Sequence, residues 1–98
     1  MSLERLREAH RLTETMLQLA RDGEWESLGE LEQQRRDQLD RLELGGAGDA
    51  AETAALGLLQ DIQTMNRELL TLSEAERARV RQALLQLRKG DQARRAYR

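Results

Sequence analysis

The stretch Ala55–Leu72, ALGLLQDIQTMNRELLTL, decides the fold of this chain of 98 residues. Its apolar side chains recur at alternating spacings of three and four, the heptad pattern of a helix packed along a seam. At 100° per residue the apolar positions cover about 200° of arc, and one neighbouring helix requires only about 100°. We therefore expect this helix to bury two faces, against two neighbours or against one neighbour and a partner. The heptad positions are Ala55, Leu58, Ile62, Met65, Leu69 and Leu72.

The pattern predicts that this helix extends from about residue 50 to about residue 89. Asp49 and Glu52 are spaced as in a capping box at its start, and Gly90 is suited to end it. Apolar residues become sparse between Ser73 and Arg79, and the order Ser73-Glu74-Ala75-Glu76 is itself a capping-box match. A hinge at that point stays an alternative, but the pattern favours one continuous helix. After Gly90, a short final helical turn is expected.

Two shorter helices are predicted before the long one, at about residues 2–21 and 24–43. Gly23 separates them and is suited to the left-handed backbone conformation that ends many helices. Three glycines between residues 45 and 48 form the only clear loop. The chain is thus predicted to be all-α: one domain over residues 1–98, an antiparallel hairpin or bundle of three main helices (about 2–21, 24–43, 50–89). A short C-terminal helical tail follows, with 80–98 as a movable segment.

Composition excludes several classes of function. The chain has no cysteine and one histidine, which removes disulfides, thiolate metal sites and cysteine nucleophiles. No glycine-rich phosphate loop and no nucleophile–base arrangement can be found, so we expect neither an enzyme nor a bound cofactor or metal. No apolar run is long enough to span a membrane, and the first residues lack the apolar stretch of a signal peptide. A soluble, cytoplasmic protein is expected.

The net charge of −2 conceals a strong asymmetry. Residues 1–76 hold 8 arginines and 17 acidic residues, a net charge of −9, whereas residues 77–98 carry +7. A basic tail on an acidic body is compatible with affinity for nucleic acid or a membrane surface, with a tail that folds back on the body, or with a basic face that is simply solvated. The one aromatic residue near the tail, Tyr97, does not make a stacking platform for bases. We therefore expect no direct nucleic-acid binding and no membrane insertion.

Three polar residues lie in or beside the apolar stripes. Arg35 falls within the stripe of the second helix, and its simplest role is to pair with a neighbouring glutamate; the alternative is to receive an acidic group of a partner. Asn66 lies within the stripe of the long helix, where a buried asparagine can set register. His10 is interpreted as a boundary residue.

Two segments of the chain resemble FliT-type flagellar export chaperones. Leu19–Leu28, LARDGEWESL, is similar to the family's LA-x-x-G-E-W-x-x-L segment, and Ala93–Tyr97 is similar to its C-terminal segment ending in Ala-Tyr. The order of helix, GEW turn, helix, linker, long amphipathic helix and basic tail also fits. The resemblance covers nearly the whole chain, and its specific motifs are the GEW turn and the Ala-Tyr ending.

The resemblance implies a cytoplasmic chaperone for type III secretion through the flagellum. Such a protein binds the C-terminal amphipathic segment of the filament-cap protein FliD, keeps it unassembled and delivers it to the export apparatus. Family members also contact the export ATPase and the export gate FlhA, and some inhibit the regulator FlhDC. Tyr97 matches the tyrosine that serves gate recognition. The family's C-terminal helix can cover the cargo site, which here places a lid at Val80, Leu84 and Leu87.

A leucine-rich groove on the long helix agrees with that role, and methionine adapts to different side chains. The candidate cargo-binding residues are Leu56, Leu59, Ile62, Met65, Leu69 and Leu72. Two alternatives stay open. One is a chaperone of the same design for hook–filament junction proteins, and the other is a coiled-coil dimerisation module without cargo. Whether the chain forms a homodimer is also open.

Overall fold

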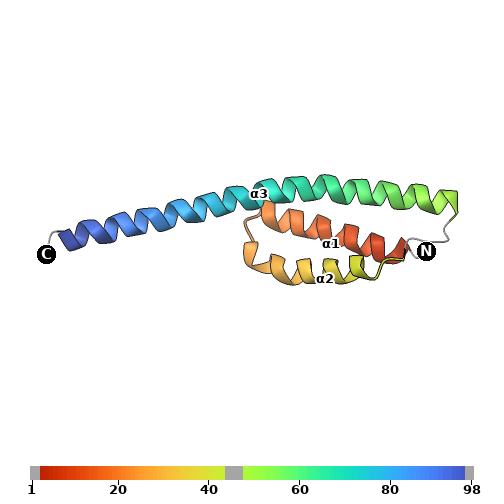
Figure 1. Ribbon diagram of the computed structural model, residues 1–98, viewed down its shortest axis with the longest axis horizontal. Coiled ribbons are helices and arrows are strands. Elements are labelled where there is room, and N and C mark those ends of the chain that lie inside the picture. The colour runs from red at the N-terminus through yellow and green to blue at the C-terminus, as the bar shows by residue number, and fades with distance from the viewer. Residues whose placement is uncertain (1–2, 44–47, 97–98) are drawn as a thin grey trace.

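The computed structural model is one long helix with a shorter helix packed along its first half and a second short helix packed on that shorter one (Figure 1). It describes residues 3–43 and 48–96. The elements in chain order are α1 (Leu3–Arg21), the 3₁₀ turn η1 (Trp25–Ser27), α2 (Leu28–Asp40) and α3 (Asp49–Ala96). The described residues are helical and include no strand. The predicted all-α class with three main helices is confirmed.

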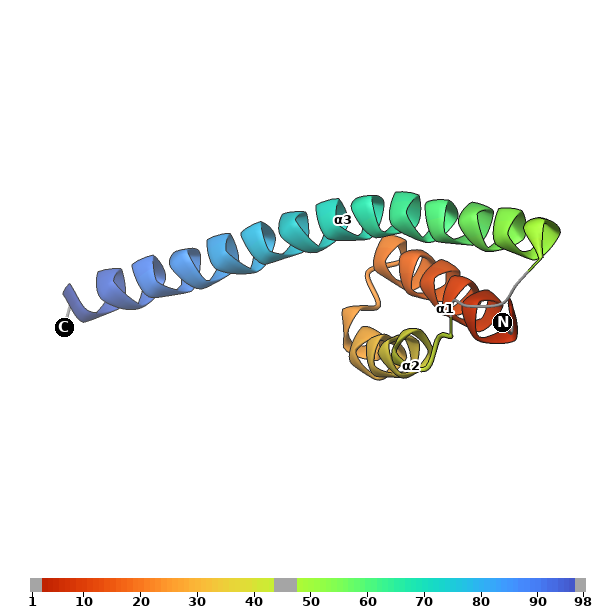
Figure 2. The same cartoon turned by 45° about the vertical axis from the view of Figure 1, so that its right-hand side comes forward.

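The body of the molecule is organised around α1, which packs against both α2 and α3 (Figure 2). α2 runs antiparallel to α1, and α3 runs in the same direction as α1. Cross-helix contacts show this parallel register, since His10 meets Asp61 and, further along both helices, Arg21 donates to Glu68 at 2.7 Å. α2 and α3 are therefore both needed to cover the apolar arc of α1.

The core lies where α1 meets its two neighbours. The buried positions of α1 cover about 140° of helical arc, which is wider than the roughly 100° that one neighbouring helix requires. Ala55 and Ile62 are the buried residues of α3, and they belong to the same cluster as Leu6 and Ala9. Leu39 and Leu42 pack against that cluster from the end of α2. The buried residues of α1 are Leu6, Ala9, Leu12, Thr13, Met16, Leu17 and Ala20.

The two halves of α3 differ because the helix is much longer than its partners. α3 has 48 residues and α1 has 19, which corresponds to about 72 Å against about 28 Å of helix. The longest dimension of the molecule is 74 Å. Residues 77–96, here called the extension, project beyond α1 and are all exposed. α3 thus contributes to the body with its first half only.

The prediction that Gly90 ends the long helix is wrong, because α3 continues without interruption to Ala96. A glycine inside a helix costs only about 1 kcal/mol relative to alanine, so good helix formers on both sides outweigh it. Asp91 lies one turn before Arg94 and Arg95 and forms ion pairs with both, which favours continuation of the helix. The hinge left open near Ser73 is likewise absent, and the favoured single helix is confirmed.

The second helix is shorter than predicted. Residues 24–43 were expected, but α2 spans Leu28–Asp40 and is preceded by the separate turn η1. At its end, the Leu42 N–H donates to the Leu39 carbonyl at 3.2 Å, so the backbone tightens there and both leucines face the core. The predicted loop glycines at 45 and 46 and the tyrosine at 97 lie outside the described residues.

Candidate functional site

The Gly23 turn positions one side of the candidate site. Gly23 has φ +77°, a left-handed conformation in which a side chain would be strained. Its N–H donates to the Ala20 carbonyl at 3.1 Å, and the Glu24 N–H donates to the Leu19 carbonyl at 2.8 Å. This pair of bonds is a Schellman motif, which satisfies the last carbonyls of α1 and turns the chain sharply. Trp25 follows at once and is held beside the end of α1.

A cleft of about 680 Å³ lies between this turn, α2 and the middle of α3. Its apolar wall includes Trp25, half-buried, and Leu70, whose exposed fraction is 58%. The cleft opens where α3 leaves the body and the extension begins. An apolar wall with a few polar groups suits an amphipathic ligand. The lining residues are Met16, Trp25, Leu28, Gly29, Glu32, Arg35, Asn66, Leu69, Leu70, Ser73 and Arg77.

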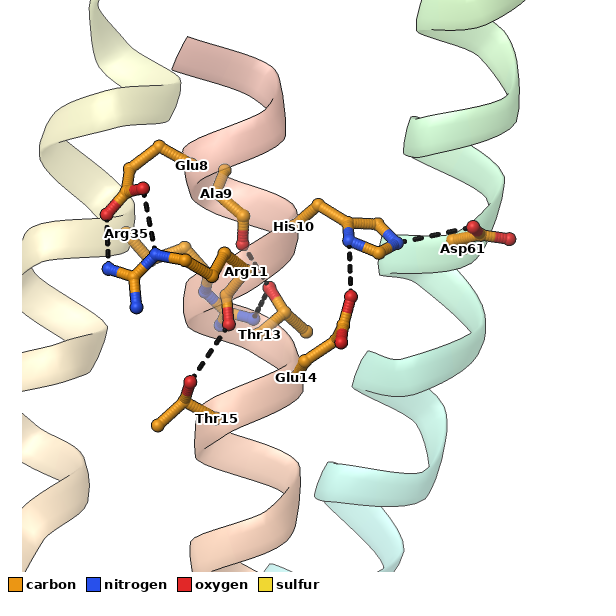
Figure 3. Close-up of polar contacts among 9 residues, drawn as sticks. All are labelled: Glu8, Ala9, His10, Arg11, Thr13, Glu14, Thr15, Arg35 and Asp61. Atoms are coloured by element: carbon orange, nitrogen blue, oxygen red, sulfur yellow. Dashed lines mark hydrogen bonds and ion pairs between the residues drawn. The ribbon is translucent and has the colours of Figure 1, made fainter. Parts of the chain in front are cut away.

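Arg35 on α2 joins three helices through one guanidinium. It donates to Glu32 at 2.6 Å, to Asn66 of α3 at 2.5 Å and to Thr13 of α1 at 3.3 Å. Figure 3 shows Arg35 reaching Thr13, whose hydroxyl also donates to the Ala9 carbonyl. The side chain is buried with all of its charge compensated. The predicted pairing with a neighbouring glutamate is confirmed. Arg35 also lines the cleft, where its guanidinium is already paired within the protein.

His10 is half-buried at the edge of the α1–α3 interface, as predicted for a boundary residue. Its ring nitrogens lie 2.7 Å from Glu14 and 3.2 Å from Asp61 (Figure 3). This contact joins the two helices away from the cleft. Among the described residues, no group of three or more histidine, aspartate or glutamate side chains could hold a metal ion.

The extension carries a second apolar surface. Val80, Leu84 and Leu87 are exposed, Leu87 to 68%, and they point to one side because they fall within about 60° of helical arc. At its base, Arg79 donates two hydrogen bonds to Glu76, at 3.0 and 2.6 Å. These bonds lower the pKa of the Glu76 carboxyl.

The six predicted cargo-binding residues do not share one surface. Ile62 is buried in the core, and Leu59 and Met65 pack against it. By helical spacing Leu59 lies on the flank of α3 that faces α2, whereas Met65 lies on the opposite flank. Of the six, the structure places Leu69 in the cleft, leaves Leu56 exposed away from it, and half-buries Leu72.

Several cleft residues were missed as binding candidates. Trp25, Leu28 and Leu70 line the cleft but are not among the six predicted binding residues. The signal that could have indicated them is the Gly-Glu-Trp order at a helix end, since a tight turn leaves the following large side chain at an element boundary.

A small helical protein with an open, mainly apolar cleft, and without clustered catalytic side chains in its described part, belongs to the class of helical binding proteins. The family model described as flagellar protein FliT matches residues 3–98, so the chain belongs to the FliT family. This is a family of flagellar export chaperones, not of enzymes. No curated protein and no solved structure matches the chain. No helix within residues 3–43 or 48–96 is long and apolar enough to cross a bilayer.

We predict that Arg35→Leu lowers the free energy of unfolding by about 1–3 kcal/mol, because it leaves the Asn66 oxygen without its donor. The matched control is Arg36→Leu, whose side chain is 61% exposed and lies 3.8 Å from Glu32; a change within about 0.5 kcal/mol is expected. Urea unfolding followed by circular dichroism measures both. Equal losses for the two variants would contradict the role assigned to Arg35.

Proposed function

We propose that this protein is a cytoplasmic chaperone for the filament-cap protein FliD. It binds the C-terminal amphipathic segment of that subunit, prevents its premature assembly and delivers it to the flagellar type III export apparatus. The membership of the FliT family supports the class of function. We choose the cleft beside Trp25, Leu69 and Leu70 as the binding surface, because it is open and mainly apolar.

The cleft has the properties that reversible binding of an amphipathic helix needs. Leu70 is exposed and Trp25 is half-buried, so apolar area is available without unfolding the body. Burying that area on a cargo helix contributes about 25 cal/mol per Å². Arg77 at the rim has no ion pair among the described residues and can donate hydrogen bonds to a carboxylate of the cargo. We place the docking point at the cleft, which Leu69 of the predicted set lines.

We predict that Leu70→Glu weakens binding of a peptide with the sequence of the FliD C-terminal segment by about tenfold or more, because it places a charge in the apolar wall. Leu56→Glu is the matched comparison, since Leu56 is 56% exposed and Leu70 is 58% exposed. Isothermal titration calorimetry measures both affinities.

A smaller loss for Leu56→Glu is expected. Equal losses of affinity for the two variants would indicate that the cargo binds along the longer heptad seam of α3 and not in the cleft. No binding by the unaltered protein would reject FliD as the cargo, and peptides from the hook–filament junction proteins are then the next to compare.

We further propose that the segment 80–98 acts as a lid through Val80, Leu84 and Leu87. In the described arrangement the extension points away from α1 and α2 (Figure 1); a closed form requires α3 to break near Ser73–Glu76 and the basic segment to lie over the acidic body. A truncation before Val80 is expected to tighten binding of the FliD peptide a few fold, most clearly at low salt. Unchanged or weaker binding in calorimetry would reject the lid.

We also propose contacts with the export ATPase and the export gate FlhA, and inhibition of the regulator FlhDC. Tyr97 is the residue assigned to the gate. Tyr97→Ala is expected to weaken FlhA binding in pull-down assays while binding of the FliD peptide stays unchanged. Equal loss of both interactions would argue against a separate gate-binding role.

A further inference from the structure

The extension continues the face of α3 that binds α1 in the body. Val80 lies eighteen residues, or about five turns, after the buried Ile62 and therefore points in the same direction. In the body, Ile62 packs in the cluster that contains Leu6 and Ala9 of α1. Beyond the end of α1 the same face is exposed, with Val80, Leu84 and Leu87 on it. The geometry of this surface suits a second helix laid in line with α1.

Three uncompensated arginines run beside this face. Arg77, Arg81 and Arg88 fall within about 40° of arc, on one flank of the apolar face. None of them forms an ion pair within the part of the chain that the structure describes. Of the other basic residues of the extension, Arg79 pairs with Glu76, and both Arg94 and Arg95 pair with Asp91. Lys89 has no ion pair among the described residues and lies on the opposite side of the helix. Three of the four unpaired basic side chains of the extension are therefore on the flank where a docked helix would lie.

We propose that the extension is a docking site for an acidic amphipathic helix of another protein. Such a helix places its apolar residues on Val80, Leu84 and Leu87 and its carboxylates opposite Arg77, Arg81 and Arg88. The proposal does not depend on the identity of the cargo, because Arg77 is the one residue that the cleft shares with this surface, and Val80, Arg81, Leu84, Leu87 and Arg88 lie outside the cleft. In the closed form proposed above, the same face would cover the acidic body, so a partner helix would hold the extension away from it.

The charge of the extension favours an acidic helix over a second copy of the extension as the bound partner. Residues 77–96 hold seven basic residues and one acidic residue, so two extensions paired through their apolar faces would repel each other. A membrane is less suitable because helices that lie in a bilayer interface present aromatic and leucine side chains over a broad apolar face. The apolar face here is narrow, and the described extension has no aromatic residue.

The experiment uses the full chain and a designed three-heptad peptide that has leucine at positions a and d and glutamate at positions e and g. A matched peptide has lysine in place of every glutamate. Fluorescence anisotropy measures binding of each labelled peptide. We expect the glutamate peptide to bind, binding to weaken as salt is raised, and the lysine peptide to bind at least about tenfold more weakly.

Two pairs of variants test the location of the site. Arg81→Glu is expected to weaken binding about three- to tenfold. Lys89→Glu makes the same charge change on the opposite side of the helix from Val80, and about a twofold effect at most is expected. Leu87→Gln should weaken binding more than Ala78→Gln, because Ala78 lies on the opposite side of the helix from Val80 and Leu87. Circular dichroism checks that every variant retains its helix content.

Three outcomes would overturn the proposal. The first is equal binding of the glutamate and lysine peptides. The second is equal loss for Arg81→Glu and Lys89→Glu, which would show a general charge effect. The third is sedimentation with vesicles of phosphatidylserine and phosphatidylcholine at concentrations where the glutamate peptide does not bind, which would identify a lipid surface as the occupant.

Discussion

The burial of α1 on two sides is the constraint on which the rest of the molecule depends. α2 and α3 lie on different sides of it, and neither could bury its own apolar face without it. The position of each helix around α1 is set by the guanidinium of Arg35, which bonds to all three helices. A buried arginine is costly unless it is paired and hydrogen-bonded, so this network favours the arrangement in which all three helices supply an acceptor. The cleft is a product of that arrangement.

The fold could be predicted largely from periodicity and turn residues. The heptad spacing from Ala55 to Leu72 indicated a helix with two faces to cover, and Gly23 marked the end of α1. Gly90 was misleading, because its cost in helix propensity is small and no tertiary contact decides the outcome in the extension. The limits of α2 were missed because the Schellman turn and the leucine contacts at its end are properties of the packed chain.

The candidate site was harder to predict than the fold. A heptad pattern shows which residues are apolar but not which of them a neighbouring helix covers. Ile62 and Leu69 are equivalent in the pattern, yet one is buried beneath α1 and the other lines the cleft near the end of α1. That difference depends on the relative lengths and register of two helices, and Trp25 joins the site only through a turn. Such a surface is formed by three segments and has no local signature.

The length of α3 means that one unbroken helix contains two thermodynamic units. Its first half unfolds only with the body, because its apolar face is buried there. The extension lies beyond the end of α1 and is exposed along its length, so its helix forms and frays as an isolated helix of about twenty residues would, with marginal stability in water. Its amide hydrogens are therefore expected to exchange through local fraying, whereas those of the core exchange only on larger openings. A partner that binds the extension can therefore order its helix without changing the stability of the body.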